Sequence, residues 1–423
     1  MKIAIIGGKL QGVELTYLAH KAGWNVIVID RKPSVPASGL CDQFIQLDIT
    51  DTSSLATALK DVELIIPANE NSETLDILHR WCHATGISLA FDAQAYAVSS
   101  SKLESDRLFA ALNVPAPVYW PDCGFPIIAK PSGGSGSEGV QLFENKKQLE
   151  KKFPGSLLPK GWVFQEYMEG PSYSLEVVGV PGRYLPLQVT DLEMDAGYDC
   201  KRVLAPTQLP ALQVKQFEKI SLKIAEAIQL KGLMDVEVIL HKGELKVLEI
   251  DVRFPSQTPT AVFHSTGINM IELLPSAPRR GEPIKNVPNK SVDLKLLIKQ
   301  KFFGGDRGAI LQKSPPHRLN VIYEHIKVTT NTIEVCGEHI MAEAGPLHLE
   351  NDFLGADEAI TNYVPGRTEW VATLIIKGTD LKDAWQKHDM VISNICSRYK
   401  LENYIDPNPV RNKEHIYDKT KTQ

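Results

Sequence analysis

The chain has 423 residues, 43% of them hydrophobic and 23% charged, and a formal net charge of −5. This length predicts roughly two or three domains, and the composition excludes a disordered, collagen-like or disulfide-scaffold chain. The lack of a basic excess argues against a nucleic-acid partner. No run approaches about eighteen apolar residues, so we expect no membrane span or membrane partner and a cytoplasmic location. The six cysteines lack metal-site spacing and are expected to be free thiols.

Short apolar runs alternate with amphipathic stretches through residues 1–95. The runs predict strands, and the stretches between them predict helices, one of them capped near Thr52 or Ser53. Such interleaving is typical of a parallel, doubly wound sheet, so residues 1–95 are predicted to form a Rossmann-like domain. The predicted strands are Lys2–Ile6, Trp24–Asp30, Phe44–Gln46, Glu63–Pro67 and Ser88–Ala90, and the predicted helices include Val13–Ala22 and Ser72–Ala84.

A glycine-rich turn, Gly7-Gly8-Lys9-Leu10-Gln11-Gly12, follows the first predicted strand, and Asp30 ends the second. The turn approximates the dinucleotide fingerprint G-x-G-x-x-G, but Lys9 replaces the glycine that lets the backbone approach a pyrophosphate. Three interpretations stay open. The turn is part of an NAD site, it needs glycine only for its geometry, or it presents amides to another ligand. In the last case, Lys9 and Asp30 would belong to a second nucleotide site.

The next features in the chain suit a phosphate group. A helix begins near Lys102, which alone is typical of a solvated helix lysine. The strand Pro126–Pro131 then carries Lys130 into the loop Ser132–Gly139. Glycines in this loop free backbone amides to surround phosphate oxygens, Ser135 and Ser137 add donors, and Lys130 adds a point charge. The alternative is a surface hairpin turn.

A second strand-like run, Val163–Pro171, ends in an acidic residue followed by two large side chains and a Gly-Pro break. Backbone groups at its end can read the edge of an adenine while Tyr167 and Met168 cover the base. Alone, this signal is weak.

Two acidic runs, Leu233–Val238 and Leu245–Arg253, predict strands joined by a hairpin at residues 241–244. Because side chains alternate along a strand, Glu249, Asp251 and Arg253 share one face, and we expect Asp235 to lie beside Glu249. The opposite face is predicted to pack in the core through Val247, Leu248, Ile250 and Val252. Clustered carboxylates on an apolar sheet require cations, and oxygen ligands suit Mg²⁺ bound to nucleotide phosphates. The alternative is a solvated sheet face.

The remainder of the chain is less informative. A Pro-rich linker is predicted at residues 275–283. Residues 276–406 are predicted to form an α+β extension packed on the preceding domain, with strand-like runs such as Val371–Ile376 and a closing helix at Leu381–Tyr399. Residues 407–423 read as a polar tail.

The lysines and glycine loop, the adenine clamp and the carboxylate strands, in this order after a Rossmann-like domain, resemble the ATP-grasp superfamily. The run Glu249-x-Asp251-x-Arg253 is similar to the superfamily's Glu-x-Asn-x-Arg signature, with Asp in place of Asn. The resemblance covers residues 1 to about 275 and implies an α/β chain with an ATP-grasp domain of two α+β subdomains at 96–275. It also implies that ATP activates a carboxylate as an acyl phosphate and that an amine displaces the phosphate.

The same resemblance implies a role for individual residues. ATP would contact Lys102, Lys130, Ser135, Ser137, Glu166, Tyr167, Met168 and Glu169. Two Mg²⁺ ions, replaceable by Mn²⁺, would be held by Asp235, Glu249 and Asp251. Arg253 would be the catalytic residue at the acyl phosphate, where one donor to an oxyanion contributes about 3 kcal/mol.

A closer resemblance, carried by Met1–Gly12, Gln165–Ser174 and Asp251–Pro259, is to the ligases of pyrrolysine biosynthesis. These join the carboxylate of 3-methyl-D-ornithine to the side-chain amine of L-lysine, which implies those two amino acids as substrates. Their binding is expected at the carboxyl ends of the first and fourth strands, just past the adenine clamp, and at the acyl phosphate. The predicted substrate-binding residues are Leu10, Gln11, Glu70, Asn71, Ser72, Glu104, Ser172, Ser174 and Arg253.

Other functions stay open at this point. One is an ATP-grasp enzyme with another acceptor, such as an aminoimidazole-ribonucleotide carboxylase using bicarbonate. An NAD-dependent dehydrogenase would leave the glycine loop and the carboxylate strands unexplained, and a non-catalytic nucleotide sensor would bind ATP without turnover. A homodimer is the starting expectation for a soluble enzyme.

Overall fold

The computed structural model describes residues 1–134, 139–154, 158–274 and 319–408. The predicted phosphate-binding residues Ser135 and Ser137, the predicted linker at 275–283 and residues 409–423 of the predicted tail lie outside the described residues.

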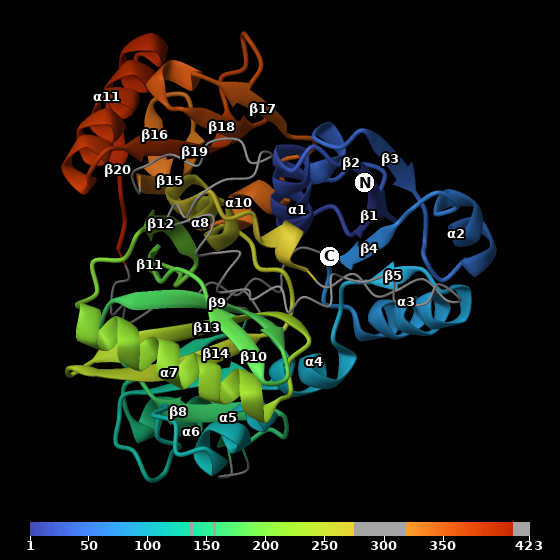
Figure 1. Cartoon of the computed structure of the whole chain (residues 1–423). Coiled ribbons are helices and arrows are strands. Elements are labelled where there is room, and N and C mark those ends of the chain that lie inside the picture. The colour runs from blue at the N-terminus through green and yellow to red at the C-terminus, as the bar shows by residue number, and fades with distance from the viewer. Residues whose placement is uncertain (135–138, 155–157, 275–318, 409–423) are drawn as a thin grey trace, which may run out of the picture.

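The N-terminal domain is the predicted Rossmann-like sheet of five strands, in the order β3-β2-β1-β4-β5 (Figure 1). The pairings are parallel and the strands alternate with helices, which confirms the fold class expected for residues 1–95. Asp51, rather than Thr52 or Ser53, caps the second helix, because its carboxylate accepts a hydrogen bond from the backbone N–H of Ser54. The elements are β1 (Lys2–Ile6), α1 (Leu10–Lys21), β2 (Asn25–Asp30), η1 (Pro36–Gly39), β3 (Gln43–Gln46), α2 (Thr52–Ala58), β4 (Leu64–Pro67), α3 (Ser72–Thr85) and β5 (Ser88–Leu89).

A small antiparallel sheet of three strands, in the order β7-β6-β8, follows the N-terminal domain. Its strand β6 carries Lys130, and its strand β8 ends at Glu166. The elements of this region are α4 (Ala93–Ser99), α5 (Lys102–Ala111), β6 (Ile127–Pro131), β7 (Gln141–Phe143), α6 (Lys146–Lys152) and β8 (Trp162–Glu166).

The remaining described strands form one sheet of twelve strands, whose main path runs β14-β13-β9-β11-β12-β15-β19-β18-β17. Its first half contains β9 (Ser172–Val180), β10 (Arg183–Pro186), β11 (Thr190–Met194), β12 (Cys200–Ala205), β13 (Gly232–His241) and β14 (Glu244–Asp251), with α7 (Ala211–Ala227), α8 (Thr258–Thr266) and η3 (Met270–Leu273). Its second half contains β15 (Asn320–Val328), β16 (Thr332–Val335), β17 (His348–Asn351), β18 (Glu358–Thr361), β19 (Trp370–Gly378) and β20 (Asn403–Ile405), with α10 (His339–Ala342), η4 (Phe353–Gly355) and α11 (Leu381–Tyr399).

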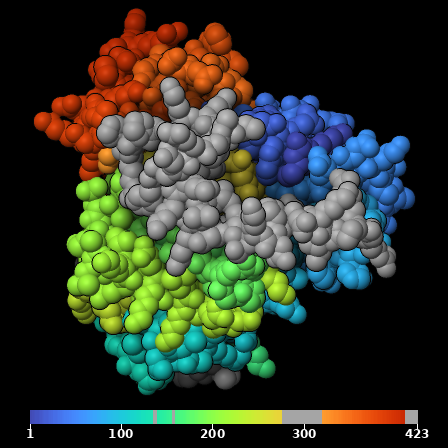
Figure 2. All heavy atoms as spheres, viewed as in Figure 1, coloured from blue at the N-terminus to red at the C-terminus, as the bar shows by residue number. Residues whose placement is uncertain are grey.

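Strand β12 pairs with β15, so the sheet continues without a break from the region of the carboxylate strands into residues after 319. The sheet therefore crosses the domain boundary expected near residue 275, and the division of the chain at that point stays a prediction. In Figure 2 the C-terminal elements, in orange and red, adjoin both the blue N-terminal domain and the green strands. One hydrophobic cluster joins Leu18 of α1, Val203 of β12 and Val321 of β15, so the three regions share a core.

The hairpin of β13 and β14 is present where the sequence predicts it. Lys242 and Gly243 have φ values of 51° and 86°, the two positive angles that a tight hairpin turn of type I′ requires. Asp235 lies opposite Asp251 and Glu237 lies opposite Glu249, so Asp235 neighbours Glu249 diagonally across the hairpin rather than directly.

A β-bulge explains a second difference from the sequence prediction. Val238 pairs with Val247 and Glu237 pairs with Glu249, which leaves Leu248 as the extra residue. Leu248 therefore lines the pocket beside Glu249 instead of packing in the core with its neighbours in the chain.

None of the described helices is long and apolar enough to cross a membrane.

Candidate active site

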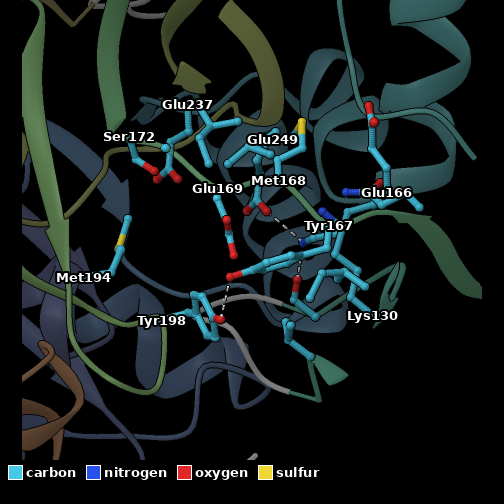
Figure 3. Close-up of a pocket in the computed structure, with 18 of the residues that line it drawn as sticks. Lys130, Glu166, Tyr167, Met168, Glu169, Ser172, Met194, Tyr198, Glu237 and Glu249 are labelled. Atoms are coloured by element: carbon cyan, nitrogen blue, oxygen red, sulfur yellow. Dashed lines mark hydrogen bonds and ion pairs between the residues drawn. The ribbon is translucent and has the colours of Figure 1, made fainter. Parts of the chain in front are cut away.

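A cavity of about 530 Å³ opens between the three-stranded sheet and strands β9, β13 and β14 (Figure 3). The residues predicted to contact ATP that fall within the described ranges all line it: Lys102, Lys130, Glu166, Tyr167, Met168 and Glu169. The cavity is thus assembled from segments that are far apart in the chain.

Two lysines and a carboxylate meet at one end of the cavity. Lys130 is only 8% exposed, and its burial lowers the pKa of the ammonium group while the charge of Glu249 opposes that effect. The Nζ of Lys102, in the first turn of α5, lies 3.0 Å from Oε2 of Glu249 and donates a hydrogen bond to the carbonyl of Gly134. Both lysines therefore stand at the start of the glycine loop, where phosphate oxygens would replace the carboxylate as partners.

The segment after β8 forms another part of the cavity wall. Oε1 of Glu166 accepts hydrogen bonds from Nζ of Lys246, at 2.6 Å, and from the backbone N–H of Val118, at 3.0 Å. These bonds lower the pKa of Glu166 against the opposing effect of its burial, which is the largest single influence. The Glu166 carboxylate thus connects β8 to β14. The backbone after Glu166 is therefore held in place beside the cavity.

A wall of the cavity comes from a hairpin that the sequence did not single out. Met194 and Tyr198, at the turn between β11 and β12, line the cavity, and the hydroxyl of Tyr198 lies 3.1 Å from that of Tyr167. No local motif marks these residues, because their place in the site depends on how β11 and β12 pair within the large sheet. Gln165 and Ser172 also line the cavity.

Four carboxylates face one another in two rows across β13 and β14. Glu237 and Glu249 form the row that lines the cavity, where both side chains point into the space beside Glu169 (Figure 3). Asp235 and Asp251 form the next row. Glu237 was not predicted, although its position two residues after Asp235 on the same strand face is a signal that could have found it.

The electrostatics of these rows fit bound cations. Burial raises the pKa of Asp251 to about 7, that of Asp235 to about 6 and that of Glu237 well above its ordinary value. Neighbouring carboxylates raise these pKa values further, and Arg253 opposes the rise. Carboxylates held so close together are costly until positive charge neutralises them, and their oxygen atoms are the ligands that Mg²⁺ prefers.

Arg253 links the carboxylates to the N-terminal domain. Its Nη2 lies 3.0 Å from both Oδ2 of Asp251 and Oε1 of Glu70. Glu70 also accepts a hydrogen bond from Nε2 of Gln11, at 3.2 Å. Two predicted substrate-binding residues are therefore connected to the predicted catalytic arginine.

Other predicted substrate residues have structural partners. Asn71 caps α3 by accepting from the backbone N–H of Thr74. Glu104 pairs with Arg107 on the exposed face of α5. Ser174 is buried and its hydroxyl donates to Oδ1 of Asp235.

Ser72 begins α3 and is exposed, and Leu10 begins α1 and packs partly buried against the core. Asp30, at the end of β2, accepts hydrogen bonds from the backbone N–H groups of Gly8, in the glycine turn, and of Lys32, both at 2.9 Å. Lys9 pairs with Glu343 at 3.3 Å. The second nucleotide site at Lys9 and Asp30 stays a prediction.

The fold and the cavity define an ATP-grasp enzyme. Residues 99–257 match the ATP-grasp domain family, and residues 3–90 match the family described as the PylC-like N-terminal domain. The chain is 34% identical over 402 residues to the 3-methyl-D-ornithine–L-lysine ligase of Methanosarcina mazei, which covers 94% of this chain and 96% of the relative. The chain therefore belongs to the 3-methyl-D-ornithine–L-lysine ligase family.

Solved structures support the fold. The N5-carboxyaminoimidazole ribonucleotide synthetase of Thermotoga maritima aligns with a TM-score of 0.58 at 19% identity, over 93% of this chain and 98% of that one. The biotin carboxylase domain of the Hydrogenobacter thermophilus 2-oxoglutarate carboxylase, solved with MgADP and bicarbonate, aligns with a TM-score of 0.64 at 14% identity, over 93% of this chain and 89% of that one. At these identities, the likeness shows the shared fold.

Proposed function

We propose that this protein joins the carboxylate of 3-methyl-D-ornithine to the side-chain amine of L-lysine in pyrrolysine biosynthesis, converting ATP to ADP and phosphate. The observation that supports this best is the continuous line of groups from Lys130 and Lys102, through Glu249, to Asp251, Arg253 and Glu70. Along this line, groups suited to phosphate come first, the carboxylates suited to a cation follow, and groups suited to an amino acid stand last. The proposed reaction needs these three kinds of group side by side.

The cation site would be occupied by Mg²⁺, or by Mn²⁺ in its place, held by Glu237, Glu249 and Asp251. Two of these carboxylates face each other at the cavity and the third stands in the next row, and together they would supply oxygen ligands for the two ions expected. Bound Mg²⁺ supplies charge neutralisation for the transferred phosphoryl group. Asp235 was predicted as a ligand, but its Oδ1 already accepts a hydrogen bond from Ser174, whereas Glu237 lines the cavity, which favours Glu237 for that role.

In the first step, a carboxylate oxygen of the ornithine attacks the γ-phosphorus, the bond to ADP breaks and an acyl phosphate forms. The lysine amine then attacks the acyl carbon, and phosphate leaves as the amide forms. Arg253 is the donor positioned for the oxyanion of the tetrahedral intermediate, because its guanidinium stands between the carboxylates and the N-terminal domain. Lys102 and Lys130 hold the phosphates in line.

Glu70 and Arg253 together suit the second amino acid. They present opposite charges at the carboxyl end of β4, where an open parallel sheet places ligand-binding groups. An anion for the ammonium group and a cation for the carboxylate are what the main-chain groups of lysine require, which would leave its side-chain amine free to reach the acyl phosphate.

The test follows ADP release with ATP and Mg²⁺ while each amino acid is supplied alone and then together. Full turnover is expected only with both, with a product mass equal to the sum of the two amino acids less one water. ADP release stimulated by bicarbonate without any amine would favour the aminoimidazole-ribonucleotide carboxylase alternative. NADH protection against thermal unfolding would favour the dehydrogenase, and ATP binding without turnover under every substrate pair would favour the sensor.

A further inference from the structure

The turn between β11 and β12 supplies one wall of the ATP cavity and has an unusual backbone. Met194 and Tyr198 line the cavity, and the hydroxyl of Tyr198 lies 3.1 Å from that of Tyr167 (Figure 3). Tyr198 has a φ of 62°, in the left-handed region that a bulky side chain rarely adopts. Such a conformation persists only where the surrounding structure holds it, so the contacts that hold this turn bear on the cavity.

The carboxylate of Asp195 closes the turn from within. Asp195 is 8% exposed, and its Oδ1 accepts hydrogen bonds from the backbone N–H groups of Gly197, at 2.7 Å, and Asp199, at 3.1 Å. The backbone N–H of Tyr198 donates to the carbonyl oxygen of Asp195 at 3.1 Å. These bonds define the path of the chain on both sides of Tyr198.

A second set of hydrogen bonds connects the turn to residues 337–339, at the start of α10. Oδ2 of Asp195 accepts from the backbone N–H of Gly337 at 2.9 Å, and Oδ2 of Asp199 accepts from the backbone N–H of His339 at 3.1 Å. No described residue after 319 lines the cavity itself. The C-terminal region therefore reaches the nucleotide site through the turn.

The contact between the two segments is tight. A Cβ atom at Gly337 would stand 2.4 Å from the Cβ of Asp199, so only glycine fits there. Asp199 is 7% exposed, and Nδ1 of His339 lies 2.6 Å from its Oδ2. The backbone N–H of Glu338 also donates to the carbonyl oxygen of Cys200 at 3.1 Å. Because the segments are packed this closely, a displacement of one would displace the other.

The same side chains have a spacing that would also suit a metal ion, because ligand atoms of Asp195, Asp199 and His339 all lie within 4.8 Å of one another. Both oxygens of Asp195 and Oδ2 of Asp199 already accept hydrogen bonds from backbone N–H groups, however. A metal ion would compete with these bonds, whereas a structural anchor uses them. The hydrogen bonds therefore favour the anchor.

We propose that Asp195 and Asp199 are positioning residues for the nucleotide. They fix the β11–β12 turn to residues 337–339 and thereby hold Tyr198 and Met194 in the wall of the ATP cavity. This inference rests on the role that the cavity has in the function proposed above. It also gives the C-terminal region a part in nucleotide binding without any contact to the nucleotide.

The experiment measures the binding of ADP with Mg²⁺ by calorimetry, without amino acids. Asp199→Ala is expected to raise the Kd by about tenfold through the displaced turn, and Asp199→Asn, which keeps one acceptor oxygen, should bind more tightly than Asp199→Ala. Tyr198→Ala should weaken binding by a similar factor. Because Asp199 acts through the turn, the double variant should bind ADP about as tightly as Tyr198→Ala alone.

Ile395→Ala, a buried change on α11, is the control for stability, since it should lower the unfolding temperature and leave the Kd for ADP unchanged. Thermal unfolding shows that each variant is folded. An unchanged Kd in folded Asp199→Ala, or losses in the double variant that multiply to about a hundredfold, would overturn the inference. So would a thermal stabilisation by Zn²⁺ alone that Asp199→Ala abolishes, since that result identifies a metal site. Wild-type protein that binds no ADP would contradict the proposed function, and the inference with it.

Discussion

Asp251 gives a direct test of the idea that the carboxylate rows are built to hold cations. Burial raises its pKa from 3.8 to about 7, against the opposing charge of Arg253 and with the help of Glu249. In the metal-free protein, the folded state therefore binds a proton that the unfolded chain has already released. The free energy of unfolding should fall as the pH rises from the unfolded pKa through the folded one.

The size of this effect follows from the shift of about three pKa units, each equivalent to about 1.4 kcal/mol. The full loss is at most about 4 kcal/mol, of which about 2 kcal/mol falls between about pH 5.5 and pH 7.5. Asp251→Asn keeps the size of the side chain but cannot titrate, so urea unfolding without metal should show a shallower pH dependence in the variant. Mg²⁺ with ADP should stabilise the wild-type protein more at pH 7.5 than at pH 5.5. Equal pH slopes for the two metal-free proteins would refute the reasoning.

Further predictions concern the nucleotide, the second amino acid and the core. Lys130→Met removes the buried cation at the glycine loop, so it should weaken ATP binding, measured by calorimetry, by at least about tenfold. Its control, Lys147→Met on the exposed face of α6, should leave ATP binding unchanged. Glu70→Gln removes the charge that faces Arg253, so it should raise KM for L-lysine by about tenfold and leave KM for ATP unchanged. An equal effect of Glu73→Gln, an exposed change on α3, would argue against a specific role of Glu70. Trp370→Ala, at the centre of an aromatic cluster in the C-terminal region, should cost about 3–5 kcal/mol of stability in urea unfolding; a loss below about 1 kcal/mol would contradict its place in the core.

The sequence predicts the N-terminal sheet, the β13–β14 hairpin and most of the nucleotide cavity, because each is encoded locally. Alternating apolar runs mark the parallel strands, and Gly243 marks the hairpin turn. The helix predicted at Leu381–Tyr399 has those bounds in the structure. Local patterns of this kind depend only on residues that are neighbours in the chain, so they can be recognised without knowledge of the tertiary fold.

The features that sequence reasoning missed depend on long-range pairing. The bulge at Leu248 brings Glu237 opposite Glu249, whereas a regular ladder would pair Glu237 with Leu248, and an apolar residue gives no sign of the bulge. Tyr198 reaches the cavity because its hairpin is part of the large sheet.

The most direct test of the central claim supplies L-lysine labelled with ¹⁵N at the side-chain nitrogen, together with ATP, Mg²⁺ and 3-methyl-D-ornithine, and fragments the product by mass spectrometry. We expect one ADP for each product molecule, with the label in the new amide bond. A label that remains in a free amine, or ADP release that does not depend on both amino acids, would contradict the proposed ligase reaction.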